Sequence, residues 1–232
     1  MELLRVTGLH AFYGESHILH GVDITVDRGE VVILLGRNGA GRTTTLKAIL
    51  GLVGARSGSV TIDGHEAIGL PSHRIARLGV GYCPEERGIY SSLTVEENLL
   101  LPPPLAPGGM SIDDIFAMFP NLKGRSGTQG TRLSGGEQQM LAVARILRTG
   151  AKLLLLDEIS EGLAPVVVKA LSSMIHALRD KGYTIVLVEQ NFRFALPLAD
   201  RFYVMEHGRI VDGFAASELQ GKLSMLNVRL GI

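Results

Sequence analysis

The 232-residue chain has one cysteine, no tryptophan and no excess of either charge. The lone Cys83 excludes a disulfide within the chain and is typical of a protein from a reducing cytosol. Because 23 basic residues balance 23 acidic ones, the sequence predicts no surface for polyanions, and nucleic acid is not an expected partner.

Long apolar segments are also missing. No run approaches the ~20 residues that span a bilayer, and the start Met-Glu-Leu-Leu-Arg lacks the basic and apolar regions of a signal peptide. We therefore expect any membrane role to come through partner chains. The length suits one large domain with a sub-domain, and a hydrophobic content of 46% allows a buried core.

Glycine, in contrast, is plentiful, and three glycines fall within the stretch Gly36–Thr44. A buried strand is predicted before this stretch, at 31–35, and a helix after it, at 43–51. In such a setting, backbone N–H groups and the helix N-terminus surround a phosphate. The pattern is the Walker A form G-x-x-x-x-G-K-[ST]. The candidate ATP-binding residues are Gly36, Arg37, Asn38, Gly39, Ala40, Gly41, Arg42, Thr43 and Thr44.

One Walker A position departs from that form, since Arg42 stands where lysine is usual. Arginine keeps the positive charge, but its guanidinium is longer, planar and forked. We expect Arg42 to grip phosphate oxygens from a different place in the loop. We expect nucleotide binding to be retained, and the hydrolysis rate to be the property that this substitution affects.

Two acidic residues end a second predicted buried strand, at 152–156. This Asp157-Glu158 pair has the form of a Walker B motif. Asp157 is expected to hold magnesium together with the Thr43 hydroxyl, and Glu158 to polarise an attacking water. Such a pair can also merely cap the next helix, but the upstream Walker A favours the catalytic interpretation.

A second anion-binding segment is predicted at Leu133–Gln139. Ser134, Gly135, Gly136 and Glu137 open a helix whose apolar positions recur at helical spacing. Small residues at a helix N-terminus expose backbone N–H groups to an anion. The alternative is an ordinary loop, which this run of residues makes improbable.

The intervening sequence predicts helices inserted into an α/β core. Thr94 and Glu97 form a capping box before a helix at 93–101, and a second helix is expected at 111–119. Residues 85–150 are therefore interpreted as a helical sub-domain, and residues 1–84 and 151–232 as the core. Further helices are predicted at 71–78 and 166–179, and strands at 3–9, 22–26, 57–64, 80–83, 184–188, 202–205 and 209–211.

An aromatic residue, Tyr13, lies in the turn-rich segment expected between the first two strands. Its ring could stack on adenine, or it could be an ordinary packed or surface tyrosine. The residues alone leave both readings open.

The order of Walker A, Leu-Ser-Gly-Gly-Glu and Asp157-Glu158 resembles the ATP-binding cassette (ABC) transporter ATPases over nearly the whole chain. Segments 83–85, 93–98, 160–165 and 188–191 are similar to ATPase subunits of branched-chain amino-acid importers. The resemblance implies a P-loop cassette of the α/β class, with a mainly parallel core sheet, an antiparallel β part and an inserted helical sub-domain. It also implies ATP and Mg²⁺ as cofactors.

The resemblance further assigns roles to individual residues. Tyr13 would stack on adenine, and Glu158 would act as the base or orient the attacking water. Glu85 takes the place of the glutamine that senses the γ-phosphate, near magnesium and the membrane subunit, and Gln190 takes the place of the switch histidine. Glu85 and Gln190 are familiar in the branched-chain subgroup. Ile159 stands where a proline often follows the Walker B glutamate, and we expect this difference to be tolerated.

The same resemblance implies an assembly. Because each chain has one Walker A and one signature, two ATPases would bind head to tail and sandwich each nucleotide, as a homodimer or with a second ABC ATPase. Transmembrane permease subunits would dock near Glu85 and residues 94–101 at the cytoplasmic face of the inner membrane, served indirectly by a periplasmic solute-binding protein.

Two rival hypotheses are a cassette in repair or translation, and a regulatory subunit that binds ATP with little hydrolysis.

Overall fold

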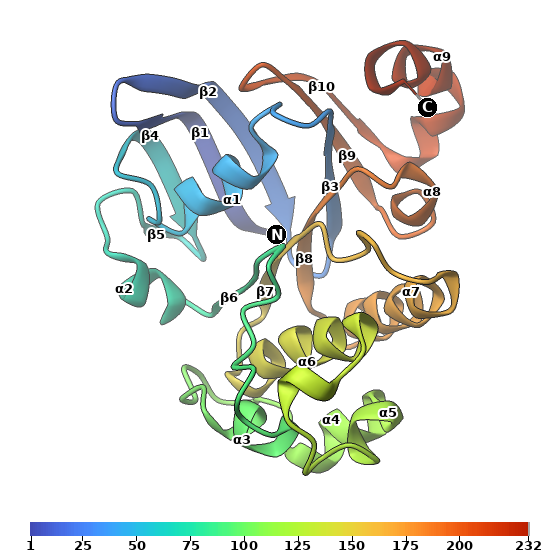
Figure 1. The fold of residues 1–232 in the computed structure, drawn as a ribbon. Helices are drawn as coiled ribbons and strands as arrows, with labels where there is room; N and C mark the ends of the chain where they lie inside the picture. The colour runs from blue at the N-terminus through green and yellow to red at the C-terminus, as the bar shows by residue number, and fades with distance from the viewer. Residues whose placement is uncertain (232) are drawn as a thin grey trace.

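The centre of the molecule is a six-stranded sheet in the order β10-β9-β3-β8-β7-β6 (Figure 1). The computed structural model describes residues 1–231. All neighbouring strands in this sheet run parallel except β9 and β10, which form an antiparallel hairpin. The strands are β3 (Val31–Gly36), β6 (Val80–Cys83), β7 (Leu153–Asp157), β8 (Thr184–Glu189), β9 (Arg201–Glu206) and β10 (Arg209–Ala215). The predicted mainly parallel core is confirmed.

Strand β3 is buried on both faces, which explains its unbroken apolar sequence. Val31, Ile33 and Leu35 belong to the core that includes helices α6 (Gly135–Arg148) and α7 (Pro165–Asp180). Val32 and Leu34 belong instead to the core shared with helix α1 (Arg42–Ile49) and the second sheet. The loop that follows β3 is therefore anchored between two hydrophobic cores.

The second sheet is antiparallel, in the order β2-β1-β4-β5. Its strands are β1 (Glu2–Tyr13), β2 (Ser16–Asp27), β4 (Ala55–Ile62) and β5 (His65–Glu66). The predicted bounds at 3–9 and 22–26, with a turn-rich segment between them, were wrong. The ladder continues to Tyr13 opposite Ser16, so the connection is only two residues long. Positive φ angles at Gly8 and Gly21 accompany irregular register that hides the alternation of apolar and polar residues.

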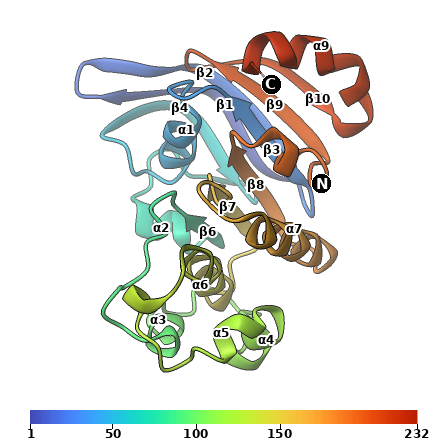
Figure 2. The same cartoon turned by 45° about the vertical axis from the view of Figure 1, so that its right-hand side comes forward.

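A group of helices lies between β6 and β7 in the chain and covers one end of the molecule (Figure 2). The predicted capping box is present, because the Thr94 hydroxyl accepts the Glu97 N–H and Glu97 accepts the Thr94 N–H. Helix α6 extends from this group onto β6, so it joins the helices to the core sheet. The division at 84/85 and 150/151 stays a prediction. The helical elements here are α3 (Val95–Leu100), α4 (Ile112–Met118), α5 (Pro120–Lys123), η1 (Gly130–Arg132) and α6.

Several short or marginal helices were not predicted. Helix α5 begins at Pro120, directly after the predicted helix at 111–119, and α8 (Phe192–Ala195) follows the predicted strand end. The C-terminal helix α9 (Leu219–Leu230) fully buries only Leu226, so its sequence carries little apolar periodicity. Helix α2 (Ser72–Ala76) and η2 (Ala216–Glu218) complete the described elements.

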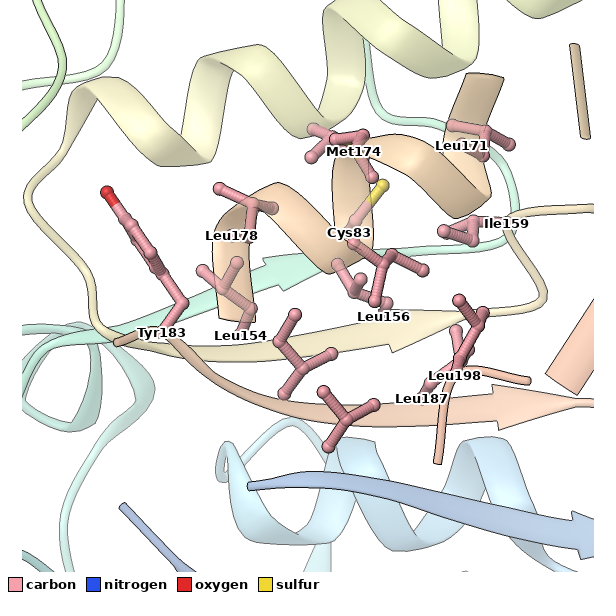
Figure 3. Packing of buried hydrophobic residues seen from close by; sticks show 14 of the residues in the cluster. Cys83, Leu154, Leu156, Ile159, Leu171, Met174, Leu178, Tyr183, Leu187 and Leu198 are labelled. Atoms are coloured by element: carbon pink, nitrogen blue, oxygen red, sulfur yellow. The ribbon is translucent and has the colours of Figure 1, made fainter. Parts of the chain in front are cut away.

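The packing between α7 and the parallel strands is shown in Figure 3. Leu171, Met174 and Leu178 repeat at helical spacing and lie over Leu154 and Leu156 of β7. In the same cluster, burial raises the pKa of the Cys83 thiol to about 12, so this cysteine is a core residue without a reactive thiolate.

Candidate nucleotide site

The loop between β3 and α1 has the backbone geometry of a phosphate cradle. A Cβ atom at Gly36 would lie 2.7 Å from the Met205 carbonyl oxygen, so only glycine fits there. Gly39 and Gly41 adopt positive φ angles of 79° and 108°, and Gly41 caps the N-terminus of α1. Arg37, Asn38 and Gly39 are exposed. The loop therefore presents its backbone to an open space at the end of the helix.

That open space is a cavity of about 410 Å³ that brings together predicted residues from distant parts of the sequence. Tyr13, at the tip of the β1–β2 hairpin, is 45% exposed at its rim. The lining also includes Asn38–Thr44, Glu85 and Glu158, with Ile18 and Glu161. Tyr13 is thus positioned beside the phosphate loop rather than packed in the core.

Asp157, at the end of β7, is fully buried and touches two hydroxyl groups. Its carboxylate accepts one hydrogen bond from Thr43 Oγ1 at 3.0 Å and another from the Tyr82 hydroxyl at 3.2 Å. Burial raises the pKa of Asp157, whereas these two bonds lower it. The contact joins Walker A to Walker B through oxygen atoms of the kind that magnesium prefers.

Arg42 forms a buried ion pair with Glu158. The distance from Nη2 to Glu158 Oε1 is 2.7 Å, and the two side chains are only 4% and 11% exposed. Nη2 also contacts Asn38 Oδ1 at 3.3 Å, while Nη1 is buried without a hydrogen-bond partner among residues 1–231. The guanidinium is therefore bound to the predicted catalytic glutamate and still has donor capacity to satisfy.

Glu158 itself has unusual surroundings. Its φ angle of 46° lies in the left-handed region, which turns the chain sharply just after β7. Burial raises the pKa of its carboxyl to about 7, helped by the Glu161 hydrogen bond and by the charges of Glu161 and Glu85, and opposed by Arg42. A carboxyl that titrates near neutral pH has the proton affinity expected of a general base.

The Ser-Gly-Gly segment begins α6 as predicted, but it lies outside this cavity. Ser134 caps the helix, and Glu137 accepts hydrogen bonds from the Ser134 N–H and hydroxyl at 2.8 and 2.9 Å. A Cβ atom at Gly136 would come within 2.7 Å of Val167 in the next helix, so this glycine is also required for packing. Ser134, Gly135 and Gly136 are not among the residues that line the Walker A cavity.

The end of β8 approaches the same region from another side. The exposed Gln190 lines one cavity with Glu158 and another with Gly36, Arg37 and Asn38. Its neighbour Glu189 is buried and accepts hydrogen bonds from the Ser160 N–H and hydroxyl at 3.0 and 2.9 Å. Burial raises the pKa of Glu189 to about 7. Glu189 thus positions the segment that follows Glu158.

Sequence reasoning missed three side chains near the site, Tyr82, Glu161 and Glu189, and it missed the Arg42–Glu158 contact. Tyr82 is the polar position of a short apolar strand, and Glu189 is the acidic end of another. A polar residue at such a position indicates a possible site residue, so the sequence could have identified both. Glu161 lies in a turn, and nothing in its local pattern indicates that it faces Glu158. The Arg42 contact spans 116 residues, beyond the reach of any local motif.

A phosphate loop followed by a strand-end Asp-Glu pair defines a P-loop nucleotide-binding protein of the Walker type. The family model described as "ABC transporter" matches residues 19–161. The chain therefore belongs to the ABC transporter family, as its signature segment indicated, and it is an ATP-hydrolysing transport subunit.

Three relatives align with at least 90% of this chain. The chain is 44% identical over 218 residues to the high-affinity branched-chain amino acid transport ATP-binding protein BraG of Pseudomonas aeruginosa, covering 90% of this chain and 91% of that one. It is 38% identical to the probable branched-chain amino acid transport ATP-binding protein LivF of Archaeoglobus fulgidus, covering 94% of each. The lipopolysaccharide export system ATP-binding protein LptB of Escherichia coli is 31% identical, covering 100% and 98%.

Solved structures show the same architecture. A nucleotide-free ATP-binding cassette from an ABC transporter superposes with a TM-score of 0.85 at 25% identity, covering 100% of this chain and 99% of that one. Across residues 1–231, the structure contains no helix long and apolar enough to cross a membrane.

Proposed function

We propose that this chain powers an importer for branched-chain or related amino acids. The observation that carries the proposal is the 44% identity to BraG across nine-tenths of the chain, compared with 31% to the exporter subunit LptB. In this proposal the chain binds permease subunits at the cytoplasmic face of the membrane, and a periplasmic solute-binding protein delivers the substrate. The region of Glu85 and α3 would contact the permease.

We infer roles for the site residues from their positions around the cavity. Tyr13 would stack on adenine, and residues Gly36–Thr44 would bind the phosphates. Thr43 and Asp157, whose oxygens lie 3.0 Å apart, would hold magnesium, with Glu85 nearby. Bound magnesium would neutralise charge on the phosphates. The described residues offer no cluster of three or more His, Cys, Asp or Glu ligands, which is consistent with an ion that also needs phosphate oxygens.

Arg42 would change partners during the cycle. In the present arrangement its guanidinium is paired with Glu158, and Nη1 has no hydrogen-bond partner among residues 1–231. A γ-phosphate bound in the loop would offer anionic oxygens that compete with Glu158 for the Arg42 guanidinium. Release from Arg42 would free the Glu158 carboxylate to accept a hydrogen bond or a proton from the attacking water. Gln190 would help to orient that water.

The separation of Ser134, Gly135 and Gly136 from the Walker A cavity supports a two-chain catalytic unit. Each nucleotide would be enclosed between Walker A of one chain and the signature of another ABC ATPase. Closure on ATP and opening after hydrolysis would then move the permease subunits.

A second candidate function is an ATP-binding regulatory subunit with little hydrolysis. The buried Arg42–Glu158 pair favours it, because a base held by a guanidinium cannot accept a proton until the pair opens. The intact Asp157–Thr43 contact favours hydrolysis instead.

Single-turnover ATP hydrolysis with magnesium distinguishes the two functions. We expect the wild type to hydrolyse ATP, Glu158→Gln to slow it by about 10²–10³-fold through loss of the base, and Arg42→Lys to remain active. Arg193→Lys, in the exposed part of α8, is the matched control. If the wild type binds ATP but is as slow as Glu158→Gln, while Arg42→Lys restores turnover, the chain is a regulatory subunit.

A further inference from the structure

A second cavity, of about 790 Å³, shares no lining residue with the nucleotide cavity. It lies between α7 of the core and α4–α5 of the inserted helices, with α6 beside it. Its volume is within the range of binding sites for small molecules. Neither the proposed ATPase cycle nor the predicted permease contact uses this cavity.

The walls of this cavity are largely apolar and adaptable. Met110, Met140 and Met174 line it, together with Phe119 and Leu171, and all five side chains are less than 9% exposed to solvent. Methionine side chains are flexible and polarizable, so they fit aliphatic ligands of varied shape. The walls therefore favour a hydrocarbon group.

Polar donors without protein acceptors gather at one part of the lining. Tyr183 is 2% exposed overall, but its hydroxyl, directed away from the leucine cluster in Figure 3, is open to solvent and makes no hydrogen bond within residues 1–231. Lys152 Nζ lies 4.2 Å from the centroid of the Tyr183 ring. Lys152 and Lys181 are both exposed to solvent, and within the same described residues neither forms an ion pair. Two ammonium groups and one phenol are thus available to an acceptor.

The one carboxylate in the lining is already engaged. Asp114 Oδ2 accepts hydrogen bonds from the Ser111 N–H at 2.9 Å and from the Ser111 hydroxyl at 2.7 Å, as the cap of α4. The Ser111 hydrogen bonds are the main cause of the lowered pKa of Asp114, and the charge of Lys181 lowers it by a smaller amount. The formal charge of the lining is therefore +1, which complements an anion.

We propose that this cavity binds an amphipathic carboxylate with a hydrocarbon tail. The tail would lie along the methionines, and the carboxylate would accept hydrogen bonds from Tyr183 and Lys152, with Lys181 adding positive charge. A neutral apolar ligand would displace water from the Tyr183 hydroxyl without replacing its hydrogen bond, and an inorganic anion would leave the apolar walls uncovered. The occupant would contact both α7 and α4–α5 and so would couple the core to the inserted helices.

Isothermal titration of the full chain with hexanoate, octanoate and decanoate, each below its micelle concentration, tests this proposal. We expect saturable 1:1 binding, with Kd falling about tenfold for each two added methylenes. 1-Octanol should bind at least about tenfold more weakly than octanoate, because it lacks the charge. An absence of saturable binding, or equal affinity for 1-octanol, would overturn the proposal.

Two variants locate the binding. Lys152→Gln should weaken decanoate binding by about tenfold, whereas Lys169→Gln, on the exposed face of α7 outside the cavity, should leave it unchanged. Ala177→Phe should abolish binding by filling the cavity, with an unchanged urea midpoint showing that the variant is folded. Decanoate binding that survives both Lys152→Gln and Ala177→Phe would show that the ligand binds elsewhere.

Discussion

Two glutamates at adjacent strand ends, Glu158 and Glu189, hold carboxyl groups in buried surroundings. Burial raises the pKa of each to about 7. Glu158 faces Arg42 and the nucleotide cavity, whereas Glu189 faces the Ser160 backbone and hydroxyl. The raised pKa would suit the proposed catalytic role of Glu158, whereas at Glu189 it makes the free energy of unfolding depend on pH.

The buried Glu189 makes folding depend on pH. Since its folded pKa lies above its unfolded value, the folded state binds more protons, and the free energy of unfolding falls as pH rises from about 4.5 to about 7. Glu189→Gln removes this titration. We expect the variant to gain up to about 3 kcal/mol relative to wild type between pH 5 and pH 8 in urea unfolding. The exposed Glu15→Gln is the control, and an equal offset at both pH values would contradict the prediction.

At the scale of elements, Asn98 fixes the loop that precedes α3. This fully buried side chain donates to the carbonyl oxygens of Tyr90, Leu93 and Thr94 and accepts the Tyr90 N–H at 2.9 Å. The Tyr90 N–H finds its acceptor in this amide, whereas the carbonyl oxygens of Leu93 and Thr94 also accept backbone N–H groups. The predicted permease-contact region is thus shaped by one side chain.

Asn98→Asp tests that account. The carboxylate would replace the donor and face three carbonyl oxygens, so we expect a loss of at least about 2 kcal/mol in the free energy of unfolding at pH 8. The exposed Asn121→Asp makes the same chemical change and should alter stability by less than about 0.5 kcal/mol. Equal effects of the two substitutions in urea titrations would show that the amide network is not important.

Elements with a strong local signal were predictable, and those held by distant contacts were not. The capping box at Thr94 and the buried strands at 80–83 and 184–188 come directly from the sequence pattern. Helix α9 and the full length of β1 and β2 depend on packing against other elements, so propensity alone missed them. At the site, motifs located Thr43, Asp157 and Glu158, but only the fold reveals that Arg42 binds Glu158.

At the scale of the whole molecule, one chain carries both segments of the proposed two-chain nucleotide site, Walker A and the Ser-Gly-Gly signature. The Walker A cavity and the Ser134 helix start are separate within residues 1–231, which supports the proposed head-to-tail pairing. Helix α6 links the signature to the core sheet beside β6. A change at the signature can therefore reach the core through a rigid element.

If this chain pairs with itself, its mass should double when a non-hydrolysable ATP analogue and magnesium are added, as measured by light scattering after gel filtration. Ser134→Arg should keep analogue binding but remain monomeric, because the side chain fills the surface that faces the partner's nucleotide. Ser92→Arg, at another exposed serine, is the control. A monomer in the wild type would contradict the homodimer and leave pairing with a second ABC ATPase.

The position of Tyr13 also allows nucleotide binding to be followed by fluorescence. The sequence has no tryptophan, and Tyr13 stands 45% exposed at the rim of the nucleotide cavity. A Tyr13→Trp variant would therefore carry a single indole fluorophore at the place where an adenine ring is expected to stack. Its emission would quench on binding and recover on product release, so each turnover could be followed optically without a label.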